Sequence, residues 1–318
     1  MPREAPSMHA AKSAVAALSI ASNATLLLGK LTVGLLIGSV SIISEAIHSG
    51  VDLIASVIAF VAVRTSAKPA DAHHPYGHGK YENLSGAIEA LLILGAAAWI
   101  IIEAIHKLKN PQPIGHVGIG IVVMLVSSLV NWLISQRLFR IGRQTDSIAL
   151  QADAWHLRID VYTSAGVMAG LGLIWLGQRL LPGTNLAWID PVAALGVTVL
   201  ILKAAWDLTA ESVRDLLDAS LPEHEEQWIV AHIKSQYPTV SGVHDMRTRK
   251  GGSTRFIEFH LIVPAQMSVR QSHDISDEIE RDIERQYPVT HVSIHVEPCQ
   301  QPCPKSCLPG CFRAANVG

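Results

Sequence analysis

The chain has 318 residues, of which 49% are hydrophobic and 16% are charged, with a formal net charge of −2. An ordinary soluble domain has roughly 25% charged residues, and the mean hydropathy of this chain is positive, at +0.30. The deficit of charge lies in the first two-thirds, which indicates a membrane part. The small net charge gives no reason to expect a nucleic acid as a partner.

A membrane-spanning helix needs about 20 mainly apolar residues. After a polar N-terminal tail (1–12), six segments approach this requirement: 13–37, 40–64, 85–107, 115–138, 147–180 and 188–209. They predict a six-helix transmembrane domain over 13–209. The fifth segment is long for one span, so we expect it to run past the bilayer or to end early near Gly177.

Six spans put both termini on one side of the membrane, and the cationic residues indicate which side. The loops after the second and fourth spans carry more of them than the opposite loops, which predicts that the former loops and both termini are cytoplasmic. The two sets are Arg64, Lys68, Lys80, Arg137, Arg140 and Arg143 against Lys107, Lys109 and Arg179.

Two apolar segments share the pattern acid-Ala-x-His-x-x-x-Asp, once ending at Asp52 and once at Asp160. On a helix, a His and an Asp four residues apart project from the same face. Two such helices packed together bring two nitrogen and two oxygen ligands into one space, which suits a tetrahedral Zn²⁺ ion. We therefore predict an intramembrane metal site of His48, Asp52, His156 and Asp160.

The alternative is that each pair only forms a local hydrogen bond. Within a bilayer an ionisable side chain costs a few kcal/mol and marks a functional site by default, which favours the metal site. The acids that begin the two motifs, Glu45 and Asp153, either orient the imidazoles or face a hydrated cavity. Lys30 in the first span either reaches the interface or pairs with Glu45.

The segment between the second and third spans is held out of regular structure by Pro and Gly. It contains Asp71, His74 and His78, which predict a second site for the same kind of ion, with His73 as an alternative to His74. The competing interpretation is an ordinary polar loop.

Residues 210–298 have a soluble composition. The pattern predicts helices at 222–236 and 268–286, strands at 243–249, 255–263 and 291–296, and a hairpin turn at 250–254. This order indicates a small α+β domain with one sheet. Its candidate ligands are His244, His260, His273, His295 and Glu297, and the alternative is that these are exposed residues without a ligand.

A tail over 299–318 contains Cys299, Cys303, Cys307 and Cys311. Its prolines argue against a helix. Thiolates there are able to capture a soft metal ion, but no CxxC pair indicates a structured zinc finger.

The paired His-x-x-x-Asp motifs, the run Asp71-x-x-His-Pro-Tyr-Gly-His-Gly-Lys and the segment from Leu216-Leu217-Asp218 to His295-x-Glu-Pro-Cys resemble the cation diffusion facilitator family, in particular its bacterial zinc and ferrous-iron efflux branch. The resemblance covers roughly residues 12–299. It implies a homodimer in the inner membrane, with a cytoplasmic ferredoxin-like, metallochaperone-like domain.

The resemblance also implies proton-coupled export of a divalent cation, with Fe²⁺, Cd²⁺ and Co²⁺ as alternatives to Zn²⁺. It assigns the transport, loop and dimer-interface sites to the residues named above, and it pairs Lys80 with Asp218. His48 stands where this branch often has Asp, and an added nitrogen ligand favours zinc over harder ions. Glu297 stands where the branch typically has Asp.

Three other functions share some of these features. A non-transporting metal sensor or scaffold would have the same binding residues, and a channel would lack proton coupling. An intramembrane metallopeptidase needs a general base, but the chain contains no His-Glu-x-x-His motif, so we expect a protein that is not an enzyme.

Overall fold

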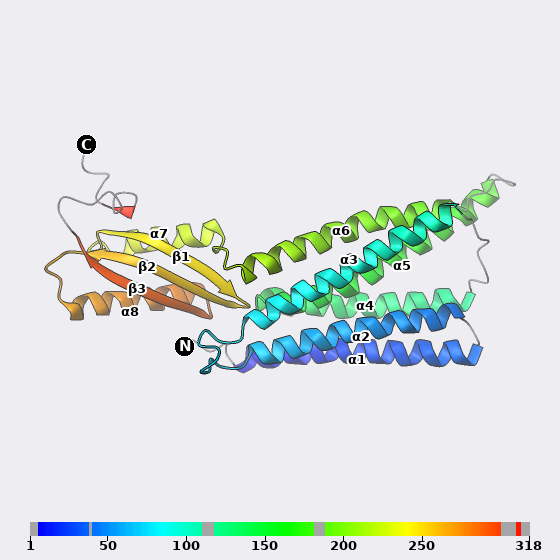
Figure 1. Ribbon diagram of the computed structural model, residues 1–318, viewed down its shortest axis with the longest axis horizontal. Coiled ribbons are helices and arrows are strands. Elements are labelled where there is room, and N and C mark those ends of the chain that lie inside the picture. Colours follow the sequence, from blue (N-terminus) through cyan, green and yellow to red (C-terminus); the bar gives the residue numbers. More distant parts are fainter. Residues whose placement is uncertain (1–5, 38–39, 110–117, 181–187, 300–309, 313–318) are drawn as a thin grey trace. The chain divides into compact units, whose positions relative to one another are not determined.

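The computed structural model of this chain describes residues 6–37, 40–109, 118–180, 188–299 and 310–312. By their contacts they fall into two compact units, Ser7–Val213 and Arg214–Gly318, the latter together with Met1–Pro6. The first unit is helical, and the second contains a small sheet (Figure 1).

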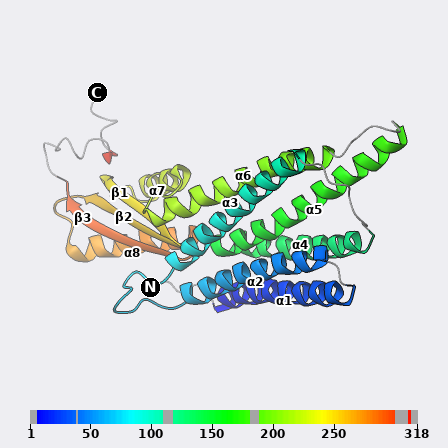
Figure 2. The same ribbon diagram turned by 45° about the vertical axis from the view of Figure 1, so that its right-hand side comes forward.

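Long helices lie alongside one another in the first unit (Figures 1 and 2). They are α1 (Pro6–Ile37), α2 (Val40–Ser66), α3 (Lys80–Lys109), α4 (Gly118–Gln144), α5 (Ile148–Leu180) and α6 (Ile189–Leu216). Each coincides with one of the predicted apolar segments. Within the described residues, five of them are long and apolar enough to cross a membrane, and α5 is not among the five.

Helices α1 and α3 begin before the apolar segments predicted from residues 13 and 85, at Pro6 and Lys80. A buried ion pair explains the difference: Lys12 Nζ lies 3.2 Å from Glu82 Oε1, and both side chains are 1% exposed. Apolarity alone excluded these residues from the helices, but a charge is tolerated in the interior when it is paired. The hydroxyls of Ser66 and Ser147 also donate hydrogen bonds to Glu82, so four segments meet at this carboxylate.

Helix α5 packs against α2, α3 and α4. It contributes Ala149, Ala154 and Leu157 to one apolar cluster, and Ala152 and Ile159 to another. The small side chains let the helix backbones approach closely. Because its first half is enclosed by other helices, α5 can carry charged residues there without exposing them to lipid.

The second unit consists of α7 (Glu223–Gln236), β1 (Gly242–Gly251), β2 (Thr254–Val263), α8 (Val269–Gln286) and β3 (Thr290–Pro298). The strands form one sheet in the order β1-β2-β3, with β1 antiparallel and β3 parallel to β2. The predicted order of elements and the single sheet are confirmed. The hairpin turn contains Gly252, whose φ of +62° is a conformation that glycine adopts at little cost.

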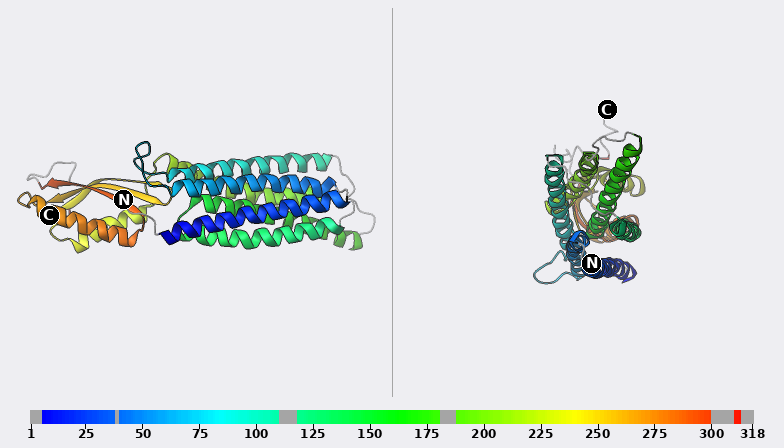
Figure 3. Two further views of the ribbon diagram at one scale, coloured as in Figure 1. Left: turned by 90° about the horizontal axis from the view of Figure 1, so that it is seen from below. Right: turned by 90° about the vertical axis from the view of Figure 1, so that its right-hand side faces the viewer.

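Helices α7 and α8 cover one face of this sheet, as Figure 3 shows on its left. Ile257, Phe259 and Leu261 of β2 point into the shared apolar core, together with residues such as Ile233 and Ile283 of the helices. Side chains alternate along a strand, so His260 lies on the opposite face. That face is where the candidate ligands of this unit gather.

Candidate metal-binding sites

Helices α2 and α5 bring together three of the four predicted transport ligands. The Nε2 atom of His48 lies 3.5 Å from Asp160 Oδ1 and 3.9 Å from Asp52 Oδ1. One ligand atom from each of these three residues falls within a group that spans no more than 4.8 Å. The helical spacing of four residues places His48 and Asp52 one turn apart on α2, as the sequence predicts.

The fourth predicted ligand, His156, meets the other three through Asp52. Its Nε2 atom lies 3.0 Å from Asp52 Oδ1, and the side chain is buried. A metal ion bound by both groups would take the place of the proton in this hydrogen bond. Metal binding at His156 therefore requires the loss of a proton from this contact.

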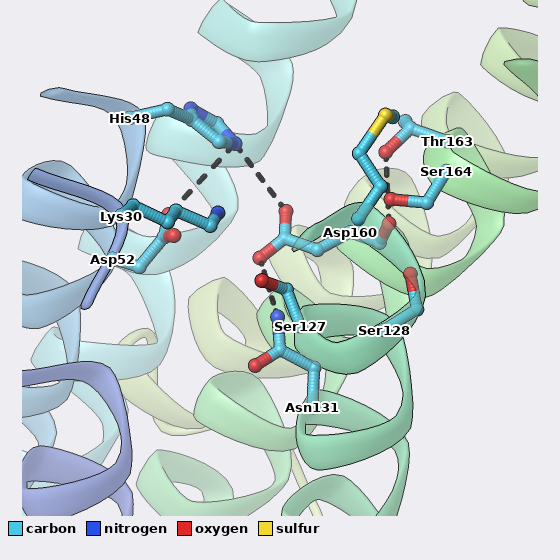
Figure 4. Close-up of a pocket in the computed structure, with 10 residues that line it drawn as sticks. Lys30, His48, Asp52, Ser127, Ser128, Asn131, Asp160, Thr163 and Ser164 are labelled. Atoms are coloured by element: carbon cyan, nitrogen blue, oxygen red, sulfur yellow. Dashed lines mark hydrogen bonds and ion pairs between the residues drawn. The ribbon is translucent and has the colours of Figure 1, made fainter. Parts of the chain in front are cut away.

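A cavity of about 150 Å³ adjoins these ligands. Figure 4 shows Ser127, Ser128 and Asn131 of α4 facing Asp160 across it. Asn131 Nδ2 donates a hydrogen bond of 3.4 Å to Asp160 Oδ2. No residue of α4 was predicted from the sequence as part of the site, although polar residues within an apolar segment were a usable signal.

Two side chains near the motifs form hydrogen bonds with α2. Lys30 Nζ donates to Ser49 Oγ at 2.9 Å, and the side chain of Glu45 lies outside the described residues. Asp153 Oδ1 accepts a hydrogen bond of 2.9 Å from Ser56 Oγ. In this arrangement Asp153 is held by α2.

The predicted loop residues also converge. Asp71 lies 3.4 Å from His74 through Oδ1 and Nδ1, and 3.4 Å from His78 through Oδ2 and Nε2. The three offer ligand atoms within 4.8 Å of one another. His78 is 7% exposed while the other two are about half exposed, so the cluster has a fixed side and an open side. His73, the alternative to His74, is not in the cluster.

Backbone hydrogen bonds shape this loop. Asp71 Oδ1 accepts from the N–H groups of His74, at 2.7 Å, and of His73, at 2.9 Å. Donation from the His74 backbone is the main reason that the pKa of Asp71 is lowered from its ordinary value. The carboxylate is therefore ionised at neutral pH and in mild acid, which is the state that binds a cation.

Three histidines form a row across the sheet of the second unit. His244 on β1 pairs with His260 on β2, which pairs with His295 on β3. Glu297 reaches the row from β3, with Oε2 3.0 Å from His244 Nε2 and Oε1 3.1 Å from His260 Nδ1. These two histidines and Glu297 form a group with metal-ligand spacing, and His295 lies slightly farther off, 3.8 Å from Glu297.

The structure places one further acid, Asp245, beside this row, and it places the predicted ligand His273 away from it. Asp245 Oδ2 lies 3.6 Å from His260 Nε2. It sits at a bulge in β1, with a φ of +48°, which the alternating pattern could not reveal. His273 lies apart on α8, where it contacts Asp277, and its side chain is 71% exposed.

Of the four cysteines, Cys299 and Cys311 lie within the described residues and are free thiols. Cys303 and Cys307 lie outside them. The backbone of Cys311 forms an isolated antiparallel β-bridge with Gly242, and the Phe312 N–H donates a hydrogen bond of 2.9 Å to the Ser241 carbonyl. Residues 310–312 therefore lie at the edge of β1, which the sequence did not indicate.

These observations define a membrane protein with clusters of histidines and carboxylates in its helices, in a loop and on a sheet. Comparison with known proteins identifies the class. Residues 16–217 match the cation efflux transmembrane domain, and residues 221–299 match the cytoplasmic domain of cation efflux proteins. The chain belongs to the cation diffusion facilitator family.

The chain is 37% identical to the cation-efflux pump FieF of Klebsiella pneumoniae over 84% of its own length and 86% of the pump's. It is 36% identical to an uncharacterised transporter of Synechocystis over 76% of each chain. A solved structure titled as the zinc form of the putative zinc transporter CzrB is 36% identical and covers 25% of this chain and 90% of its own, with a TM-score of 0.24. The protein is thus an integral membrane cation efflux transporter.

Proposed function

We propose that this transporter exports Zn²⁺ in exchange for protons, and that His48, Asp52, His156 and Asp160 bind the ion. The observation that carries the proposal is the convergence of His48, Asp52 and Asp160 within 4.8 Å, where α5 packs against α2, a helix long and apolar enough to span a membrane. Together with His156 they supply two nitrogen and two oxygen atoms, a set that suits tetrahedral zinc. Harder ions such as Mn²⁺ prefer oxygen ligands, and Fe²⁺, Cd²⁺ and Co²⁺ are the alternative substrates.

The proton exchange follows from the chemistry of the ligands. An imidazole binds metal only when it is neutral, and a histidine in water titrates near pH 6.5. Protons and the metal therefore compete for His48 and His156. Facing the cytoplasm the site loads the metal, and facing outward it releases the metal as protons bind.

We propose that the loop cluster and the histidine row bind regulatory ions. Asp71, His74 and His78 form the loop site, and His244, His260, His295 and Glu297 form the site on the sheet. The high exposure of His295, at 67%, supports a role at the surface between two subunits of a homodimer. His273 is equally exposed and is proposed to complete such a site across the dimer.

The wider architecture is proposed as follows. The helix α5 crosses the bacterial inner membrane as a sixth span, both termini lie in the cytoplasm, and the second unit is a ferredoxin-like domain. The transmembrane domain occupies 13–209, the cytoplasmic domain 210–298 and the cysteine tail 299–318. The excess of Arg and Lys in the loops after the second and fourth spans supports this orientation, and Lys80 is proposed to pair with Asp218.

The test is zinc flux into vesicles that contain the purified protein, with and without an opposing pH gradient, while the lumenal pH is followed. Gradient-driven zinc uptake with matching proton counterflow is the expected result. The matched variant is Asp52→Asn, which keeps the size of the side chain but removes a charged ligand, and it should abolish flux while the protein stays folded. Zinc binding without flux under either condition would overturn transport and favour a sensor or scaffold.

A further inference from the structure

A buried carboxyl group on α3 has no role in the mechanism described so far. Glu89 is fully buried, and among the described residues neither of its carboxyl oxygens has a hydrogen-bond partner. An ionised carboxylate in such surroundings is very costly, whereas the neutral acid is tolerated. The position is therefore suited to a group that holds a proton.

A second buried carboxyl group lies on α5. Asp153 is fully buried; its Oδ1 atom accepts from Ser56, and within the described part of the chain its Oδ2 atom has no hydrogen-bond partner. Asp153 and Glu89 interact electrostatically. Two carboxyl groups that share a buried site do not both ionise readily, so such a pair retains a proton and titrates as a unit.

Two lysines of the neighbouring helices form ion pairs with other acids. Lys12 of α1 pairs with Glu82, two helical turns before Glu89 on α3. On α6, Lys203 and Asp207 pair with each other at the exposed surface of the helix. The remaining ionisable groups that act on Asp153 are His156 of its own helix and Asp52 of α2.

A chain of polar side chains connects the pair with the transport site. Ser56, which donates to Asp153, accepts a hydrogen bond of 2.7 Å from Asn23 Nδ2. The same amide group lies 3.4 Å from the Asp52 carbonyl oxygen, and Ser19 Oγ lies 3.1 Å from Ser56 Oγ. The hydroxyls of Ser19 and Ser56 can both donate and accept, whereas the Asn23 amide group only donates. These groups make a polar path beside Asp153 and do not by themselves form a proton wire.

The pair also lies on a definite side of the transport site. Asp153 precedes His156 on α5, Ser56 follows Asp52 on α2, and Glu89 lies in the first third of α3. Relative to the transport ligands, Asp153, Ser56 and Glu89 all lie toward the end of the bundle where α2 ends and α3 begins. Under the proposed topology this is the cytoplasmic end, where a counter-transported proton leaves the protein.

We propose that Glu89, with Asp153 as its partner, forms a proton-binding site separate from the metal ligands, which carries a counter-transported proton between the transport site and the cytoplasm. This inference rests on the proposed proton antiport. Zinc at the transport site repels the proton on the pair, and a proton on the pair disfavours zinc, so the two cargoes exclude each other.

The test replaces Glu89 by glutamine, which has the same shape but cannot release a proton. In vesicles, Glu89→Gln should lose the stimulation of zinc flux by an opposing pH gradient and the accompanying proton counterflow. In detergent it should still bind zinc, but release fewer protons for each zinc ion bound, as measured from binding heats in buffers of different ionisation enthalpy. Ser212→Ala is the matched control, because Ser212 of α6 is also fully buried and its hydroxyl also lacks a hydrogen-bond partner among the described residues.

The outcomes separate this inference from the proposed function. Absence of gradient-driven flux in the unmodified protein overturns the antiport itself. Coupling in the unmodified protein and equal coupling in Glu89→Gln overturns only the proton-binding role of Glu89. If Glu89→Gln does not fold, Asp153→Asn is measured in its place, and normal coupling and proton release there would equally reject the pair.

Discussion

The Nε2 atom of His156 lies 3.0 Å from the Oδ1 atom of Asp52, although the two residues are 104 positions apart in the chain. This contact joins the two copies of the His-x-x-x-Asp motif in one site. It also gives the site a built-in competition, because the atoms that share a proton here are the atoms that would bind a metal ion. The predictions below test this site and its neighbours.

The nitrogen ligand at position 48 should set the choice of metal. We expect His48→Asp to lower zinc flux relative to Mn²⁺ flux by about tenfold or more, because a carboxylate replaces an imidazole and harder ions prefer oxygen. The measurement is the ratio of zinc to manganese flux in vesicles. Ser127→Ala, which alters the wall of the same cavity, should leave the ratio unchanged. An unchanged ratio in His48→Asp would show that position 48 does not select the ion.

The two functions of Asp71 should be separable. Asparagine at this position can still accept the backbone hydrogen bonds that shape the loop but is a weaker metal ligand, whereas alanine loses both properties. We expect Asp71→Asn to raise the dissociation constant for zinc at the loop by about tenfold or more without changing the rate of amide exchange in the loop. Asp71→Ala should raise both the dissociation constant and the rate of amide exchange. The control is His73→Ala, and a loss of loop zinc in that variant would contradict the assignment to His74.

Acid should affect the carboxylate of Asp71 only at low pH. The pKa of Asp71 is lowered in the folded protein, so its contribution is present above the ordinary value and is lost as the pH falls through the lowered one. The ionisation of Asp71 should therefore not control zinc release from the loop in mild acid. Asp71→Asn should keep the same midpoint of release at its lower affinity.

The row of histidines should make the dimer sensitive to zinc. We expect His260→Ala to reduce the zinc-induced tightening of the dimer by about tenfold or more, because His260 lies between His244 and His295 and contacts Glu297. The measurement is the dissociation constant of the dimer in detergent, with and without zinc. His224→Ala, an exposed histidine on α7, is the control. Full zinc dependence in His260→Ala would exclude the row as a regulatory site.

The hydrogen-bonded carboxylate of Asp282 should stabilise the second unit in a pH-dependent way. Asp282 of α8 lies 2.8 Å from His232 Nε2 and accepts a 2.9 Å hydrogen bond from Tyr237. The contact with His232 is the main reason that the pKa of Asp282 is lowered. Its stabilisation is thus present above the ordinary pKa of an aspartate and is lost as the pH falls through the lowered value.

We expect Asp282→Asn to destabilise this unit by about 1 kcal/mol at neutral pH, the usual net value of one such hydrogen bond. Thermal unfolding of the full chain at neutral pH and at a pH below the lowered pKa measures the effect. The difference between the two proteins should shrink at the acid pH. A constant difference would show that the charge of Asp282 contributes nothing.

The sequence by itself determined the elements and the spacing of candidate ligands. Apolar runs of spanning length and alternating strands are local patterns, and they located the ends of each helix and strand of the described residues to within seven positions. The four-residue spacing of His48 and Asp52 is likewise a property of one helix. The repetition of the motif predicted that the two copies share one site. Whether these residues bind metal stays a prediction.

Only the tertiary structure decided which side chains meet. The wall formed by Asn131, the bulge that turns Asp245 toward His260, and the burial of Glu89 against Asp153 depend on how helices rotate against each other and on strand register. The early start of α3 has the same origin, because Glu82 is buried only where Lys12 is present to pair with it. Such contacts join residues distant in sequence, and their energies depend on packing that no local pattern contains.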